Sequence, residues 1–138
     1  MTMRHILLVL ALFAAPAAAQ AADVTGNWLT GDKSALVVIA RCGEALCGTI
    51  AKVLIERPGY PKTDVRNPDP KLRNRPIEGL RILSGFSRRG DKWEGGRIYD
   101  PRSGKSYASK MALNSDGSLN VSGCIPIFCK TVRWTRAR

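Results

Sequence analysis

Charged and amide side chains suited to binding chemistry are concentrated between residues 56 and 79. Prolines at positions 68, 70 and 76 stand between several of them, and the polar members include Asp64, Arg66, Asn67, Asp69, Arg73, Arg75 and Glu78. An arginine fork donates two parallel hydrogen bonds to a carboxylate or phosphate. We therefore expect Arg73 and Arg75, together with Asp64 and Asn67, to contact a polar or anionic group of a small ligand.

Two other interpretations of the same residues stay open. Ion-pair networks that order a loop are common, and these side chains would then bind only one another and the backbone. Alternatively, Asp64 with Glu78 or Asp100 would form an acid–base pair that acts on a glycan. The sequence does not set the distance between these carboxyl groups, and each is equally suited to a cap, a turn or an ion pair.

The first 21 residues have the pattern of a secretory signal peptide. A short basic region at Arg4 precedes an apolar run over residues 6–14, and small residues follow in Ala-x-Ala steps. We expect cleavage after Ala21, with Ala19 as the alternative, and a mature periplasmic or secreted domain over residues 22–138. An uncleaved anchor helix is the other interpretation of this segment. No later stretch is long and apolar enough to span a bilayer.

Loss of this leader removes His5, the only histidine of the chain. A mature chain without histidine cannot use a Ser-His or Cys-His nucleophile. It also cannot form a histidine-ligated zinc or iron site. We therefore expect a protein that is not an enzyme and that holds no metal or cofactor; any catalysis would depend on carboxylates, lysines or tyrosines.

The chain is strongly basic, with a formal net charge of +11. Residues 1–21 contain one of its 22 basic residues and none of its 11 acidic residues, so the mature charge is +10. A field of this sign attracts anions, and an exported protein meets anionic envelope lipids and glycans. We do not expect nucleic acid as a partner, because no long block of Lys and Arg occurs. A basic surface that serves only solubility is the plainer alternative.

The rest of the chain alternates short β-type segments with turn signals. Strands are predicted over residues 25–30, 34–41, 48–55, 80–86, 93–99, 105–113, 119–123 and 130–136. Gly95 and Gly96 predict a bulge or bend, and Asn114 to Gly117 a tight hairpin turn. About eight short strands without a convincing helix predict an all-β fold, either a sandwich or a single up-and-down antiparallel barrel. We favour the barrel, because closure hides the edges that a small open sheet exposes.

The segment from Glu56 to Gly79 has neither a strand nor a helix period, so it is predicted to be one long ordered loop without regular structure. Over the mouth of a barrel it would act as a lid or rim. Trp93, Tyr99 and Tyr107 are candidate walls for a ligand, because each combines an apolar body with a polar edge. Trp28 and Trp134 are expected in the core.

Four cysteines form two pairs with the same spacing, Cys42-x4-Cys47 and Cys124-x4-Cys129, each around a predicted hairpin turn. In an exported protein an even cysteine count favours disulfides, and bridges within each hairpin are the simplest pairing. If the last strand pairs with the first, we expect both turns at one end of the barrel, where bridges between hairpins become possible. A four-thiolate zinc site is the competing interpretation.

Several motifs resemble a known family in the right order along the mature chain. They are Gly26-x-Trp28, Asp64-x-x-Asn67-Pro68-Asp69-Pro70-x-Leu72-Arg73-x-Arg75-Pro76, Gly79-Leu80, Gly95-Gly96-x-Ile98-Tyr99-Asp100-Pro101, Gly104-Lys105-x-Tyr107 and Trp134-Thr135-Arg136. They resemble the bacterial domain of unknown function 2147. This resemblance implies an exported lipocalin-like or fatty-acid-binding-protein-like barrel and no established activity. Gly26-x-Trp28 is also similar to the lipocalin opening, in which the Trp seals the barrel floor beneath an Arg, here Arg136 or Arg133.

These observations predict a binding module for a small anionic or amphipathic molecule. The main alternative is an envelope interaction protein with a filled barrel and a basic docking face. Side chains that face the lumen distinguish the two, since large ones would fill it and small ones would leave room for a ligand.

Overall fold

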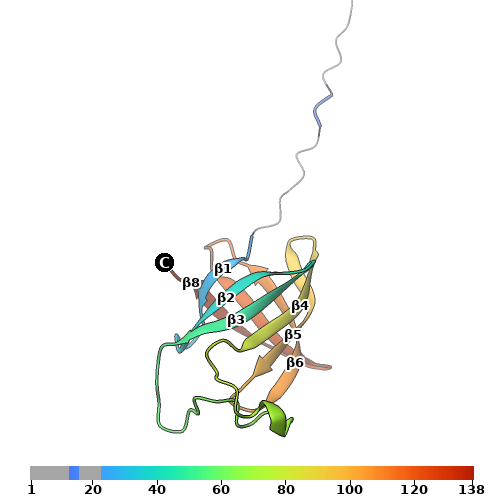
Figure 1. The fold of residues 1–138 in the computed structure, drawn as a ribbon. Coiled ribbons are helices and arrows are strands. Elements are labelled where there is room, and N and C mark those ends of the chain that lie inside the picture. The colour runs from blue at the N-terminus through green and yellow to red at the C-terminus, as the bar shows by residue number, and fades with distance from the viewer. Residues whose placement is uncertain (1–12, 16–22) are drawn as a thin grey trace, which may run out of the picture.

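The computed structural model describes residues 13–15 and 23–138. In this part of the chain eight antiparallel strands form one closed barrel (Figure 1). The strands are β1 Gly26–Leu29, β2 Ala35–Cys42, β3 Ala45–Val53, β4 Arg81–Arg89, β5 Lys92–Asp100, β6 Lys105–Leu113, β7 Leu119–Ile125 and β8 Phe128–Arg136. The all-β, up-and-down barrel predicted from the sequence is therefore confirmed.

The barrel closes where β1 pairs with β8, with Trp28 opposite Arg136 and Leu29 opposite Thr135. Each strand runs antiparallel to the next, so the connections alternate between two ends. The loop end carries residues 30–34, 54–80, 101–104 and 126–127, and the terminal end carries the turns at 43–44, 90–91 and 114–118. Figure 1 shows the long loop below the barrel and the C-terminus beside its opposite end.

The two disulfides lie within hairpins at opposite ends of the barrel. Cys42 bonds to Cys47 at the terminal end, and Cys124 bonds to Cys129 at the loop end. We expected pairing of the first and last strands to bring both turns to the same end of the barrel, and this was wrong. Five strands, β3 to β7, lie between the two turns, and because neighbouring strands run in opposite directions, an odd number of strands places the turns at opposite ends. Each turn is also tighter than predicted: only two residues separate the strands, since both hairpins continue through their cysteines.

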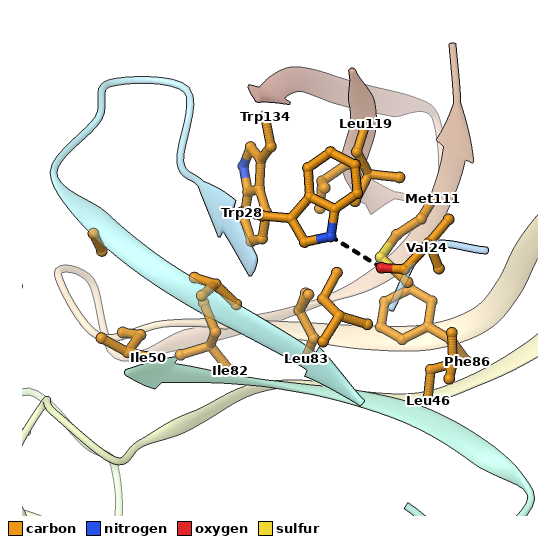
Figure 2. Close-up of a cluster of buried hydrophobic side chains, with 14 of the residues drawn as sticks. Val24, Trp28, Leu46, Ile50, Ile82, Leu83, Phe86, Met111, Leu119 and Trp134 are labelled. Carbon is orange, nitrogen blue, oxygen red and sulfur yellow. Dashed lines mark hydrogen bonds between the residues drawn. The ribbon is translucent and has the colours of Figure 1, made fainter. Parts of the chain in front are cut away.

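The terminal half of the lumen is filled by a hydrophobic core. Its largest fully buried side chains are Trp28, Phe86, Ile39, Leu46, Leu83, Met111 and Leu119. Figure 2 shows Trp28 among them, with its indole Nε1 donating a 2.9 Å hydrogen bond to the carbonyl of Val24. Full burial of a single large apolar side chain stabilises a fold by about 1.5–3 kcal/mol, so this cluster is the main anchor of the barrel.

An arginine covers the outer face of the Trp28 indole, as the lipocalin resemblance implied. The guanidinium carbon of Arg136 lies 4.3 Å from the ring centroid. Its two terminal nitrogens donate to the carbonyls of Thr25 and Asp23, at 3.0 and 3.1 Å. Arg133 instead forms a 3.3 Å ion pair with Asp116. Of the two candidates, Arg136 is therefore the residue that closes the barrel floor.

The bend predicted at Gly95–Gly96 is present in β5. The register with β6 shifts between Trp93 and Gly96, and Gly95 adopts a φ of 72°. Gly96 faces the lumen against the ring of Phe86, where a β-carbon would lie only 2.6 Å from the ring atoms. Glycine at this position lets the large phenyl ring occupy the barrel interior.

The long loop is ordered, but it contains one regular element that the sequence did not predict. A 3₁₀ turn, η1, spans Pro70–Leu72, and the side chain of Asp69 caps it by accepting a 3.0 Å hydrogen bond from the Lys71 amide. Proline in the first turn of a helix costs no hydrogen bond. An isolated bridge between Thr63 and Pro76 draws the two arms of the loop together.

The predicted signal peptide lies outside the described residues except for positions 13–15. Among helices of the described residues, none has the length and hydropathy needed to cross a bilayer.

Candidate functional site

The loop residues predicted as ligand contacts form a buried polar network centred on Asp64. The Asp64 side chain is fully buried. Its Oδ2 atom accepts hydrogen bonds from Asn67 Nδ2 at 2.8 Å and from Arg75 Nε and Nη2, both at 2.9 Å. Its Oδ1 atom accepts one from the Tyr99 hydroxyl at 2.5 Å. Four donors therefore saturate a carboxylate that lies away from water.

Backbone contacts extend this network across the loop. The Asp64 amide donates to the Arg75 carbonyl at 2.9 Å. Arg73 Nε donates to the Asn67 carbonyl at 2.8 Å, and Asn67 Oδ1 accepts from the Asp69 amide at 2.9 Å. These are the contacts expected if the residues order the loop by binding one another. Arg75 is half-exposed, but Asp64 is fully buried, and a buried acceptor left without its donor typically costs about 1–3 kcal/mol, so the network fixes the loop.

Tyr99 ties the loop to the barrel, because it belongs to β5 while its hydroxyl reaches Asp64. Burial, the hydrogen bond to Asp64 and the negative charge of that carboxylate raise the pKa of Tyr99 to about 12. The phenol therefore stays protonated and donates its hydrogen at every physiological pH.

A second contact docks the loop on the β5–β6 connection. Arg66 Nη1 donates a hydrogen bond to the Arg102 carbonyl. The Arg66 carbonyl packs directly against Gly104, which has a φ of 71° and no room for a β-carbon. The Asp64 network and this contact hold the loop against the barrel at two separate points.

Arg102 links the same connection to the β1–β2 connection. Its Nη2 atom donates to Asp32 Oδ2 at 2.7 Å and to Ser34 Oγ at 2.9 Å. Burial acts to raise the pKa of Asp32, but hydrogen bonds from Ser34 and Arg102 outweigh it and hold this pKa well below its ordinary value. Asp32 is therefore ionised, and its negative charge neutralises the guanidinium group of Arg102 at the rim of the barrel.

The carboxylates considered for an acid–base pair all bind neighbouring protein groups. Asp64 is saturated as described, and Glu78 Oε1 accepts from the Val53 amide at 3.0 Å. Asp100 accepts from the Arg102 amide at 2.9 Å and from Ser103 Oγ at 3.0 Å. In the described part of the chain, no group of His, Cys, Asp or Glu side chains is arranged to hold a metal ion. All four cysteines are in disulfides.

The loop half of the lumen is a cavity of about 670 Å³ that opens at the loop end. Isoleucines, valines and aromatic rings form most of its walls, and Gly123 leaves space between Ile98 and Tyr107. The inner walls are lined by Ile50, Ile82, Ile98, Tyr99, Tyr107, Val121, Gly123, Ile125, Phe128, Lys130, Val132 and Trp134. The rim is more polar and is lined by Thr30, Gly31, Asp32, Ser34, Ala35, Asp100, Pro101 and Arg102. Val132 lies inside the barrel and is still 37% exposed, so the cavity is accessible from solvent.

One cationic side chain of the barrel wall lines this cavity. Phe128, Lys130, Val132 and Trp134 occupy alternate positions of β8 and all line it. Successive side chains of a strand point to opposite faces, so Lys130 lies on the inner face with the other three. Among the described residues, the Lys130 ammonium has no hydrogen-bond or ion-pair partner.

A smaller hollow of about 90 Å³ continues this cavity beneath the first part of the long loop. It shares Ser34, Ala35, Ile50, Pro101 and Arg102 with the main cavity, and residues 55–61 of the loop contribute to its lining. Tyr60 lies at its edge with its ring centroid 5.0 Å from the Arg102 guanidinium carbon. The long loop therefore forms one side of the mouth.

The structure separates the predicted ligand contacts into three groups. Tyr99 and Tyr107 line the cavity, whereas Asp64, Asn67, Arg73 and Arg75 do not. Trp93 is buried toward the terminal end, beside a depression that also borders Ile39 and Arg41.

Sequence reasoning missed Lys130 and Gly123 as cavity residues. The signal for Lys130 was present, because the alternation of Val132 and Trp134 extends back through residues 130 and 128. No comparable signal marks Gly123, whose importance depends on which side chains of β5 and β6 face it.

Comparisons with known proteins agree with this architecture. The profile of the family described as "Uncharacterized protein conserved in bacteria (DUF2147)" matches residues 26–136. Among solved structures, protein HP1028 from the human pathogen Helicobacter pylori, which belongs to the lipocalin family, is 27% identical with a TM-score of 0.76, and the match covers 84% of each chain. No curated protein matches the chain significantly. The family profile spans all eight strands, and the chain therefore belongs to the DUF2147 family, with the fold of a lipocalin-like barrel.

Proposed function

We propose that the barrel binds a small amphipathic anion, with the apolar part of the molecule in the lumen and its acidic group at Lys130. The observation that carries this proposal is an open, mainly apolar cavity with one unpaired ammonium group on its wall. A site that combines apolar walls with a few placed polar groups is the usual form of a small-molecule pocket.

The size of the cavity and the state of the other cations support this ligand class. About 670 Å³ lies within the range of roughly 300–1,000 Å³ found for drug-sized ligands. Arg102 also reaches the rim, but Asp32 already neutralises it at 2.7 Å. Of the two cations that line the main cavity, Lys130 is therefore the one without an ion-pair partner among the described residues and the one free to attract the ligand's acidic group.

In this proposal the predicted contacts take different roles. Tyr99 and Tyr107 form part of the wall, and Lys130 replaces Arg73 and Arg75 as the anion partner. Asp64, Asn67, Arg73 and Arg75 shape the mouth by holding the loop in place. The alternative of a wholly filled barrel fits only the terminal half, where Trp28 and Phe86 occupy the lumen.

We further propose that residues 1–21 are removed and that the mature domain, residues 22–138, acts in the periplasm or outside the cell. The two disulfides support an oxidising compartment. The mass of the protein recovered from a periplasmic fraction would test both the cleavage site and the location.

The experiment compares an acidic probe with its neutral counterpart: a dansyl-labelled fatty acid and the methyl ester of the same molecule. We expect the Lys130→Met variant to bind the acid about tenfold more weakly, the loss of about 1.4 kcal/mol that a charge-assisted contact supplies. Binding of the ester should be unchanged, and Lys130→Arg should retain binding of the acid. Lys105→Met is the matched control, because Lys105 is exposed near the loop end and does not line the cavity.

Equal loss of affinity in the Lys130→Met and Lys105→Met variants would show a general effect of charge and contradict the assignment. A wild-type protein that binds neither probe, and that carries no extra mass under native conditions after extraction from an envelope fraction, would contradict the proposal as a whole.

A further inference from the structure

Exposed apolar side chains are confined to the loop end of the barrel. Over residues 23–138, the exposed large hydrophobic side chains lie in connections or strand ends on this side, except for Val132, which faces the cavity from the middle of β8. They are Leu54, Tyr60, Val65, Leu72, Ile125, Ile127 and Phe128. Single exposed apolar residues are normal on protein surfaces, but a group on one side of a small protein marks an interaction surface.

The β7–β8 hairpin tip is the most prominent part of this surface. Its sequence is Ile125-Pro126-Ile127-Phe128, with Ile127 92% exposed and Phe128 65% exposed. Pro126 suits the first central position of a turn, but Ile127 takes the next position, where Gly, Asn or Asp is usual, and its exposed side chain has no explanation in the folding of the hairpin. The Cys124–Cys129 disulfide lies directly beneath the tip, with the two Cα atoms 4.1 Å apart.

We propose that the loop end docks on an anionic lipid surface, with the side chain of Ile127 entering the boundary between headgroups and acyl chains. Apolar side chains on rigid protrusions bind membranes by this partial insertion, and basic residues around them add attraction to anionic lipids. The disulfide keeps the tip in one conformation, so insertion costs little ordering of the chain.

The charge of the protein identifies lipid rather than another protein as the partner. The chain without residues 1–21 carries a net charge of +10, and Lys33 and Lys105 lie in or beside connections of the loop end. The long loop adds six Lys and Arg residues against four Asp and Glu over positions 54–80. Small protruding apolar side chains within a basic field match an anionic bilayer, which offers both negative charge and an apolar interior.

This orientation places the mouth of the lumen against the bilayer. Phe128 and Ile125 belong both to the exposed tip and to the cavity lining, so a continuous apolar path joins the membrane to the cavity. If the barrel binds amphipathic anions as proposed above, it exchanges them directly with the lipid phase. The docking inference rests on that proposal only for this last step.

The test is flotation of the mature protein with vesicles of phosphatidylcholine alone or with phosphatidylglycerol added. We expect binding to the anionic vesicles, and a loss of about tenfold or more for Ile127→Asp, because a charge at this position is expelled from the acyl region. Ser115→Asp is the matched control: it makes the same charge change at an exposed turn of the terminal end and should bind as the wild type does.

A second readout is independent of affinity. The native tryptophans, Trp28, Trp93 and Trp134, are buried, so an Ile127→Trp variant should report the tip alone. We expect its added fluorescence to be quenched by vesicles with brominated acyl chains. Equal flotation of Ile127→Asp and Ser115→Asp, absence of binding to anionic vesicles, or an unquenched Trp at position 127 would each overturn the docking inference.

Probe binding without vesicles separates this inference from the proposed function. Ile127 does not line the cavity, so Ile127→Asp should bind the dansyl-labelled fatty acid as well as the wild type does. Normal vesicle binding by a protein that captures no probe would contradict only the lumen proposal. Normal probe binding without vesicle binding would contradict only the docking surface.

Discussion

The carboxylate of Asp64 is completely buried, and three neighbouring side chains donate four hydrogen bonds to it. Asn67 and Arg75 come from the same loop, whereas the Tyr99 hydroxyl comes from a strand and donates across 2.5 Å. A buried carboxylate without such partners would destabilise the protein by several kcal/mol. The cluster therefore holds the loop against the barrel. Because its hydrogen-bonding groups bind one another, we expect the ligand to bind elsewhere.

The raised pKa of Tyr99 predicts a specific loss of stability at alkaline pH. The folded pKa is about 12 and the ordinary value is 10.0. The corresponding stabilisation is complete below pH 10 and disappears as the pH rises toward 12, because the unfolded chain loses this proton first. We expect the free energy of unfolding to fall over this interval, and absorbance of phenolate should show one tyrosine ionising late.

Tyr99→Phe should remove both the late ionisation and this part of the alkaline decline. At neutral pH the same variant leaves one buried oxygen of Asp64 without its donor, a cost of about 1–3 kcal/mol. Tyr60→Phe is the control, since Tyr60 is exposed and its hydroxyl is not part of this network. An alkaline decline that Tyr99→Phe leaves unchanged would contradict the assignment.

The loop residues of this cluster could be predicted from the sequence, but the hydrogen bonds that join the cluster to the barrel could not. The carboxylate, the amide and the arginines stand close together along the chain, so the sequence was sufficient to raise the interpretation that they bind one another and order the loop. The decisive partner, Tyr99, lies 35 residues away. Its approach depends on where β5 ends relative to the loop, and local sequence patterns do not contain that information.

The long loop behaves as an element of the structure rather than as a flexible connection. Its arms are bridged at Thr63 and Pro76, and its central part presses against the β5–β6 connection at Gly104. A loop of this length without internal contacts would be expensive to order. The contacts of the Asp64 network and of Gly104 offset that cost.

Gly104→Ala should loosen the loop. The substitution introduces a β-carbon where the Arg66 carbonyl lies and also requires a left-handed backbone, so we expect a loss of about 2–4 kcal/mol of unfolding free energy. Gly90→Ala has a similar positive φ of 63° but meets no atom within 4 Å. This variant should lose only the unfolding free energy that a left-handed backbone costs a residue with a β-carbon, about 1–2 kcal/mol. Chemical denaturation of both variants measures the difference, and equal losses would exclude the loop contact as a source of stability.

Strand positions could be predicted because turn residues and β-branched runs alternate clearly in this sequence. The largest errors occurred at the two cysteine hairpins, where pairing continues to a two-residue turn, and at the end of β4, which runs to Arg89 instead of residue 86. The 3₁₀ turn at Pro70–Leu72 was also missed. It is a single turn fixed by a cap and a proline, too short to produce a helical period in the sequence.

At the scale of the whole molecule, the barrel is divided into a filled half and an open half. Bulky residues, Trp28 and Phe86 among them, occupy the lumen toward the terminal end. Toward the loop end the inward positions include Ala35 and Gly123, and a cavity of about 670 Å³ remains. The sequence predicted the barrel, but not this division, because the depth of each inward residue depends on strand tilt and stagger.

Gly123 provides a direct test of the open half. A β-carbon at this position would lie 3.5 Å from Ile98, an ordinary contact, so Gly123→Ala should fold and bind normally. Gly123→Leu places a branched side chain in the cavity, and we expect it to weaken binding of the acidic and the neutral probe alike, by about tenfold. Retained binding in a correctly folded Gly123→Leu variant would place the ligand outside the lumen.

Both ends of the described domain, at residues 23 and 138, leave the barrel on the side opposite the cavity mouth (Figure 1). A tether attached at either end therefore holds the barrel by its sealed floor, beneath Trp28 and Arg136. On a sensor surface or in a fusion protein, such a molecule would present its lumen outward without steric hindrance. The same arrangement would let one partner bind the domain at its sealed floor while the mouth at the opposite end remains free to bind and release a ligand.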